Sequence, residues 1–140
     1  MNEASHLGLL IGRTGLALGK AVEKEFTNSG IDLTFQHFVF LNLLSKNNSL
    51  IQQELAEIVK KDKSAVLRVI GVLEGKNLVE RCGDTCDRRK KTLLLTPIGK
   101  SMLKKAQQIE EKVMNHLQEG LTKDEITTFV KVALHLRNKI

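Results

Sequence analysis

The chain has 140 residues, of which 41% are hydrophobic and 27% are charged. This balance suits a single folded domain with a core of its own and excludes a disordered chain. It contains five Phe but no Tyr or Trp, which argues against base stacking on aromatic platforms, the usual mode of single-stranded nucleic-acid binding. The formal net charge of +6 points to a polyanionic partner.

The N-terminal segment is predicted to form a long and unusually apolar helix. Apolar residues recur at helical spacing from Leu7 to Phe26, and they cover so much of the helix that a core alone would not bury them. A second surface, such as a partner chain, is therefore expected. Because Arg13 and Lys20 interrupt the run and no basic leader precedes it, we expect no signal peptide and no membrane span, and a cytoplasmic location.

Two shorter helices are predicted next. Thr34 can serve as the N-cap of a helix that continues to about Ser45. Ser49 has Gln52 three residues further on, the spacing of a capping box. This pattern predicts a short helix over residues 50–59.

A tight turn at residues 60–62 leads to a helix over residues 63–75, which Asp62 can cap. Val66 and Ile70 lie on one face of this helix, and polar and basic residues lie on the opposite face. Asn77 follows and suits a left-handed helix end. Two helices joined by so short a turn indicate a helix-turn-helix.

Beyond Asn77 the pattern becomes strand-like. Residues 78–81 and 91–95 are predicted strands, and the Gly-Asp-Thr at 83–85 supplies turn residues between them. Two further helices are expected, over residues 97–118 after Thr96-Pro97, and over 123–137 after a Thr-x-x-Glu capping box at Thr122. The fold class is thus mainly α with a small β-hairpin, a winged helix-turn-helix core flanked by dimerisation helices.

The positive charge is concentrated in the central third. Residues 60–105 carry 13 Lys and Arg against five Asp and Glu, a net +8, whereas the remainder of the chain carries −2. A basic centre between near-neutral ends is the pattern of a nucleic-acid reader with separate assembly elements.

Several motifs together resemble one family. The segments at 53–56, 62–66 and 73–81, the Asp-Arg-Arg at 87–89 and the Leu-Thr-Pro-Ile-Gly-Lys at 95–100 look like those of the MarR family of bacterial transcriptional regulators over residues 30–100. The chain departs from the family pattern at three points. Asn77 replaces the usual Gly, Leu67 replaces a small polar residue, and two Cys lie in the wing, which is the predicted hairpin of residues 78–95.

The resemblance implies an obligate homodimer that binds pseudo-palindromic double-stranded DNA as a regulator, here expected to be a repressor. Residues 32–96 would form the DNA-binding lobe, and residues 5–29 and 97–140 the dimerisation region of this single domain. Family members also bind a small effector between the dimer helices and the lobe. No cofactor, metal or membrane partner is expected.

Candidate DNA contacts lie in the second helix of the motif and in the wing. A helix in the major groove presents its N-terminal residues to base edges, and Arg68 suits a bidentate guanine contact while Leu67 suits a thymine methyl. In the wing, arginines suit a narrow minor groove, an aspartate can orient them, and lysines meet phosphates. The predicted set is Lys63, Ser64, Ala65, Leu67, Arg68, Asp87, Arg88, Arg89 and Lys90, with Lys60 and Lys91 as phosphate contacts.

Cys82 and Cys86 leave two interpretations open. Arginines at 81 and 88 favour thiolates, so the pair could act as a redox switch that distorts the wing; equally, both could be exposed thiols of no consequence. The spacing of the cysteines and the lack of nearby histidines disfavour zinc. Similarly, His37 and His116 could be metal or effector ligands, but a lone helical histidine is more often a hydrogen-bonded interface residue.

Two rival functions are less well supported. A winged-helix protein-interaction module without specific DNA binding would not need the concentrated positive charge. An enzyme is disfavoured because no histidine pairs with a nucleophile or carboxylate at recognisable spacing and no glycine-rich phosphate loop is present.

Overall fold

The computed structural model describes residues 6–46, 50–83 and 91–140. Six helices and three strands follow one another within these ranges: α1 (Leu7–Asn28), α2 (Phe35–Lys46), β1 (Leu50–Ile51), α3 (Gln52–Val59), α4 (Lys63–Gly75), β2 (Val79–Gly83), β3 (Lys91–Leu95), α5 (Pro97–Leu117) and α6 (Lys123–Asn138). The predicted winged helix-turn-helix with flanking helices is confirmed.

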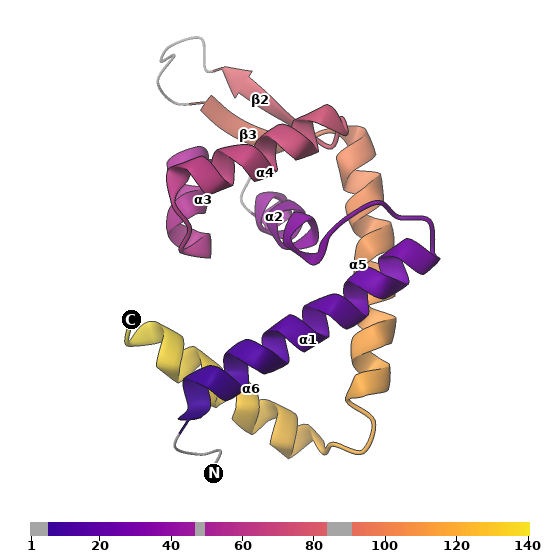
Figure 1. The fold of residues 1–140 in the computed structure, drawn as a ribbon, viewed down its shortest axis with the longest axis vertical. Coiled ribbons are helices and arrows are strands. Elements are labelled where there is room, and N and C mark those ends of the chain that lie inside the picture. The colour runs from indigo at the N-terminus through magenta and orange to yellow at the C-terminus, as the bar shows by residue number, and fades with distance from the viewer. Residues whose placement is uncertain (1–5, 47–49, 84–90) are drawn as a thin grey trace.

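The elements fall into a lobe and a frame (Figure 1). The lobe consists of α2, α3, α4 and the sheet, which lie on one side of α1. The frame consists of α1, the long α5 that runs along the molecule, and α6, which crosses the N-terminal end of α1 far from the sheet.

The sheet corrects one prediction. It has three antiparallel strands in the order β1-β3-β2, with Leu50 opposite Leu93 and Val79 opposite Leu95. The predicted helix start at residue 50 is wrong, because residues 50–51 form β1 and α3 begins at Gln52. Backbone pairing of β1 covers the edge of β3, whose N–H and C=O groups would otherwise lack strand partners. The proposed cap Ser49 lies outside the described residues.

Local capping explains why the helix boundaries follow the sequence closely. The carboxylate of Asp62 accepts a hydrogen bond from the backbone N–H of Ala65 at 2.7 Å, at the start of α4. Thr122 and Glu125 form both bonds of the predicted capping box, at 3.1 and 2.9 Å. These side chains satisfy backbone N–H groups that a helix leaves unpaired.

One continuous core joins the lobe to the frame. Phe26 from α1, Phe40 from α2, Ile70 from α4, Leu93 from β3 and Leu103 from α5 all belong to a single cluster of buried side chains. The C-terminal half of α1 and the N-terminal half of α5 are therefore packed into the lobe. No residue of α6, by contrast, is buried.

A compact arrangement of backbone groups holds α5 against the end of α4. Asn77 has the predicted left-handed conformation, with φ of 60°. The Thr96 backbone N–H donates to the Leu78 carbonyl at 3.1 Å, and its hydroxyl donates to the Asn77 carbonyl at 2.6 Å while accepting from the Gly99 N–H at 2.9 Å. We call Asn77, Leu78, Thr96 and Gly99 the α5 joint.

The joint explains the glycine in the Thr-Pro-x-Gly segment. A Cβ built on Gly99 would lie 2.0 Å from the Leu78 carbonyl oxygen, far inside van der Waals contact. Any side chain at this position would push α5 away from the turn that follows α4.

We predict that Gly99→Ala lowers the free energy of unfolding by about 2 kcal/mol or more, because overpacking against backbone cannot relax locally. The matched control is Gly71→Ala on α4, where a Cβ meets nothing within 4 Å; it should raise stability by about 0.5–1 kcal/mol. Urea unfolding at equal protein concentration measures both. Equal effects of the two substitutions would contradict the close approach.

Candidate nucleic-acid interface

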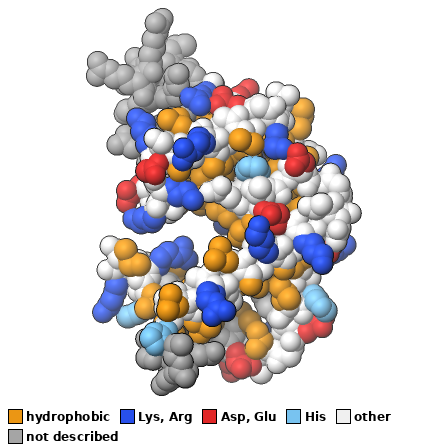
Figure 2. All heavy atoms as spheres, in the orientation of Figure 1, with side chains coloured by type: hydrophobic (Ala, Val, Ile, Leu, Met, Phe, Trp, Pro, Cys, Tyr) orange, Lys and Arg blue, Asp and Glu red, His pale blue; other side chains and the backbone are white. Residues whose placement is uncertain are grey.

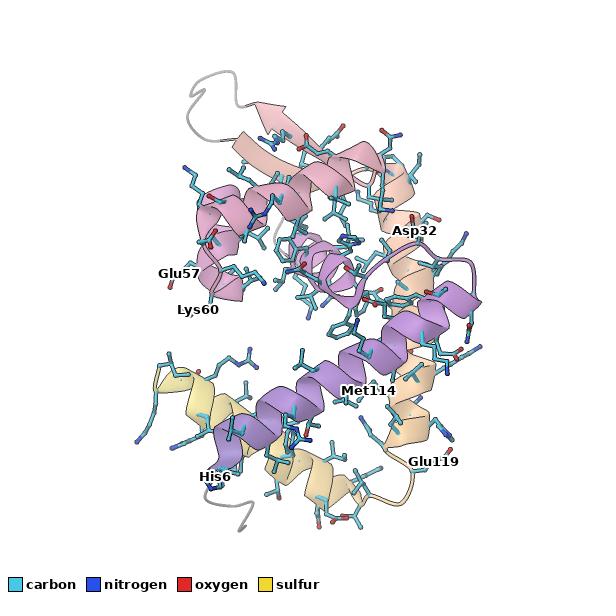
Figure 3. The ribbon with its side chains drawn as sticks, viewed as in Figure 1. His6, Asp32, Glu57, Lys60, Met114 and Glu119 are labelled. Atoms are coloured by element: carbon cyan, nitrogen blue, oxygen red, sulfur yellow. The ribbon has the colours of Figure 1, made fainter. Side chains whose placement is uncertain are left out.

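The turn between α3 and α4 orients the second helix of the motif. Lys60 has φ of 55°, a left-handed conformation that costs a non-glycine residue energy. The backbone N–H of Lys61 donates to the carbonyl of Ala56 at 3.1 Å. Figure 3 shows Glu57 and Lys60 together at the end of α3, where their side chains form an ion pair of 2.8 Å.

The two faces of α4 have opposite roles. Val66, Ile70 and Leu73 are fully buried and anchor α4 in the core. Of the residues predicted to contact DNA, Lys63, Ser64 and Arg68 are exposed, and Ala65 and Leu67 are half-buried. The structure therefore places these five residues over the first turns of α4 and leaves three of them free of the core.

The Lys and Arg side chains on and around the exposed face of α4 fall into two groups, those that form ion pairs and those that do not. The first group is paired as follows. Lys60 pairs with Glu57, Lys76 with Asp32 at 2.5 Å, and Arg81 with Glu74 at 2.8 Å. The bond from Lys60 lowers the pKa of the Glu57 carboxyl, and the bond from Lys76 lowers that of Asp32.

No carboxylate within the described ranges forms an ion pair with Lys63 or Arg68. Figure 2 shows several Lys and Arg side chains over α3 and the adjoining part of α4, with Asp and Glu side chains among them. The exposed face of α4 therefore offers positive charge that the neighbouring acids leave uncompensated.

The base of the wing is tied to α4. Arg81 on β2 donates to Glu74 on α4, and both side chains are about two-thirds buried. Sequence analysis missed this pair and the Lys76–Asp32 pair, because neither has the i, i+4 spacing that signals a helical ion pair. The pair holds β2 in place relative to α4.

Part of the predicted site belongs to the segment between β2 and β3. Asp87, Arg88, Arg89, Lys90 and Cys86 lie outside the described residues. The backbone of Cys82 lies in β2 opposite Thr92, and its side chain is not among those described. The wing contacts and the redox switch therefore stay predictions.

His37 and His116 make local contacts in the described part of the chain. Nδ1 of His37 accepts a hydrogen bond from the Thr34 backbone N–H at 3.1 Å, and Nδ1 of His116 lies 3.5 Å from a Glu119 oxygen. Within that part, no three His, Cys, Asp or Glu side chains gather as metal ligands would, and no helix is both long and apolar enough to cross a membrane.

Two apolar grooves border α1. The first, of about 790 Å³, lies between α1 and α6 and is lined by residues such as Leu10, Leu18 and Phe129. The second, of about 690 Å³, lies between α1, α2, α3 and the end of α6. Figure 2 shows the second as a hollow between the lobe and α6.

Comparison with known proteins agrees with the geometry. Residues 31–90 match the model of the MarR family. The chain is similar to this family over that segment. It is 27% identical to the HTH-type transcriptional regulator YybA of Bacillus subtilis over 130 residues, which cover 93% of this chain and 85% of YybA.

Solved MarR-family structures share the fold. A MarR/EmrR family regulator from Acinetobacter sp. ADP1 superposes with a TM-score of 0.87 at 23% identity, covering 99% of this chain and 97% of its own. A cysteine-to-serine mutant of MarR from E. coli, in complex with operator DNA, superposes with a TM-score of 0.84 at 24% identity and covers 96% of both chains.

The strained turn at Lys60 generates a test. We predict that Lys60→Gly raises the free energy of unfolding by about 0.5–1 kcal/mol, because glycine adopts a positive φ without steric cost. Its control is Lys61→Gly, which removes the same charge from the neighbouring exposed position and should destabilise. Thermal and urea unfolding measure both, and destabilisation by Lys60→Gly as large as that by Lys61→Gly would contradict the assignment.

Proposed function

We propose that this protein is a sequence-specific double-stranded-DNA-binding transcriptional regulator, acting as a repressor, that binds a pseudo-palindromic operator as a homodimer. The observation that carries the proposal is the exposed N-terminal face of α4, where Lys63, Ser64 and Arg68 stand out from a helix whose other face is buried. A helix presented in this way fits the major groove.

Each α4 residue has a role suited to its chemistry. Arg68 would bind a guanine through two hydrogen bonds, and Leu67 would contact a thymine methyl group. Lys63 would meet a phosphate, and Ser64 and Ala65 would allow close approach of the helix to base edges. Arg88, Arg89 and Lys90 would reach the minor groove and the backbone, with Asp87 orienting an arginine.

Homodimerisation would cover the apolar surface that the monomer leaves open. The Leu16 side chain on α1 is 73% exposed and the Phe129 side chain on α6 is 59% exposed. Since no residue of α6 is buried, this helix has too little packing within one chain to account for its apolar residues. A second copy that packs on α1 and α6 would bury them, and a two-fold dimer would present two α4 helices to one face of the DNA.

The groove between the frame and the lobe suits a small effector. Its walls include Phe35 and Val39, and Lys20, Lys61 and Arg137 also line it. Such a groove would accept an organic anion with an apolar body. Because α1 lies on one side of it and α3 on the other, a bound ligand would alter the position of α4 relative to the dimer frame and release the operator.

Selection from a pool of random duplex DNA tests the function. We predict an enriched palindrome with half-sites about one helical turn apart. Arg68→Ala should then weaken binding to it by about 1–3 kcal/mol and relax the preference at one base pair. Lys24→Ala, which removes one exposed positive charge from α1, is the matched control and should bind normally.

Weak binding without sequence preference, lost equally in both variants, would contradict the proposal. The cluster of positive charge would then attract any polyanion without sequence preference. A winged-helix protein-interaction module would be the better description of this protein.

The dimer has its own test. Leu16→Glu should convert the dimer to monomer at micromolar concentration, because a carboxylate in an apolar interface is costly to desolvate. Val72→Glu makes the same change at a residue that is 46% exposed on α4, in the DNA-binding lobe and outside the dimerisation region, and should stay dimeric. Light scattering after size-exclusion chromatography measures the mass, and a monomeric parent protein would refute the dimer.

A further inference from the structure

The N-terminus of α2 is capped in an unusual way. The backbone N–H of His37 donates to the Thr34 hydroxyl at 3.0 Å, and Nδ1 of His37 accepts from the Thr34 backbone N–H at 3.1 Å. These are the two reciprocal bonds of a capping box, with histidine in the position that glutamate or glutamine usually occupies.

The same helix end connects three parts of the molecule. The next backbone N–H, of Phe35, donates to the Glu23 carboxylate on α1 at 2.9 Å. The Phe35 ring lies against Gly19 of α1, where a Cβ would be 3.0 Å from the ring. Beside the cap, Asp32 pairs with Lys76 at the end of α4, and Figure 3 shows Asp32 in the segment that leads from α1 to α2.

The cap requires a neutral imidazole. Nδ1 can accept the Thr34 N–H only when it carries no proton, so the neutral ring must hold its proton on Nε2. Protonation would place an N–H on Nδ1, facing another N–H, and would remove the acceptor of the Thr34 backbone N–H at the start of α2.

The charged groups around His37 come from each element packed against it. Lys76 at the end of α4 opposes a positive imidazole, and Asp32 and Glu23 favour one. Burial is the largest influence, and together with Lys76 it outweighs the two carboxylates, so the pKa of His37 lies below its ordinary value.

We propose that the Thr34–His37 cap, together with the adjoining Phe35–Glu23 bond to α1, is an acid-sensitive joint between α1 and the lobe, which opens when His37 is protonated and thereby weakens DNA binding. The link to DNA binding rests on the proposed function, but the joint itself does not. The position of α2 helps to set that of α4, since Phe38 and Leu41 belong to the same core cluster as Ile70.

The sign of the pH effect follows from the lowered pKa. Above pH about 6.5, the ordinary histidine value, the ring is neutral in both folded and unfolded chains and the stabilisation is complete. As the pH falls below this value the unfolded chain binds the proton first, so stability declines until the folded form is also protonated.

The experiment compares the parent protein with His37→Gln, which keeps a side-chain acceptor for the Thr34 N–H and does not titrate. When the pH is lowered from 7.5 to 5.5, the folding equilibrium constant of each protomer should fall further in the parent than in His37→Gln. The additional fall in the parent should reach at most about tenfold. His116→Gln is the matched control, because His116 is exposed on α5, and it should retain the pH dependence of the parent. Nitrogen NMR of the parent should show His37 as the Nε2–H tautomer at pH 7.5.

Binding to the selected operator completes the test. The affinity of the parent should fall by up to about tenfold more than that of His37→Gln over the same pH range. If the stability of the parent and that of His37→Gln depended on pH in the same way, or if NMR showed the Nδ1–H tautomer, the proposal that His37 forms an acid-sensitive joint would be refuted. A flattened stability profile with unchanged pH dependence of DNA binding would overturn its link to the operator. Absence of operator binding at every pH would instead refute the proposed function, while the stability and NMR results would still decide the joint.

Discussion

The Leu78 carbonyl is the point on which the arrangement of the molecule depends. It accepts the Thr96 N–H and lies so close to Gly99 that no side chain fits there. This contact attaches α5, a frame helix, to the turn directly after α4. The Arg81–Glu74 pair in turn ties β2 to α4. As a result α4, β2 and the frame are held in one geometry. The proposed regulator, which would bind two half-sites, would need this rigidity, since the spacing of its helices must match that of the grooves.

The opposite side of the lobe combines apolar packing, such as the Phe26 ring of α1 against the Phe38 ring of α2, with polar contacts. There the Phe35 backbone N–H, beside the Thr34–His37 cap of α2, donates to the Glu23 carboxylate on α1, next to the open groove between α1, α2 and α3. Hydrogen bonds of this kind respond to pH and to ligands more readily than a packed backbone contact does. On the proposals above, the attachment at Leu78 is rigid and the attachment between α1 and α2 is adjustable, and signals would act on the second.

Sequence reasoning predicted most where the signal is local. The start of α4 follows from Asp62 and that of α6 from Thr122, because a capping side chain acts within three residues of itself. It failed for β1, whose two residues become a strand only because β3 lies beside them, a long-range contact that no local pattern encodes. The exposed residues of α4 were predictable from helical periodicity, whereas the Glu74–Arg81 pair depends on the path of the chain through Asn77. The role of His37 as a capping residue was also missed, since histidine is not a usual member of a capping box.

Half-site spacing is the most direct test of this account. Affinity should be measured for the selected palindrome and for versions with about five or about ten base pairs inserted between its halves, half a turn and a full turn of DNA. If both α4 helices are held rigidly on one dimer frame, the half-turn insertion should reduce affinity to that of a single half-site, because the second half-site rotates to the far side of the duplex. The full-turn insertion should not restore it, because the second half-site then lies beyond the reach of the fixed frame. Unchanged affinity for either insertion would mean that the lobes move independently, and it would contradict the rigid attachment through Leu78 and Gly99.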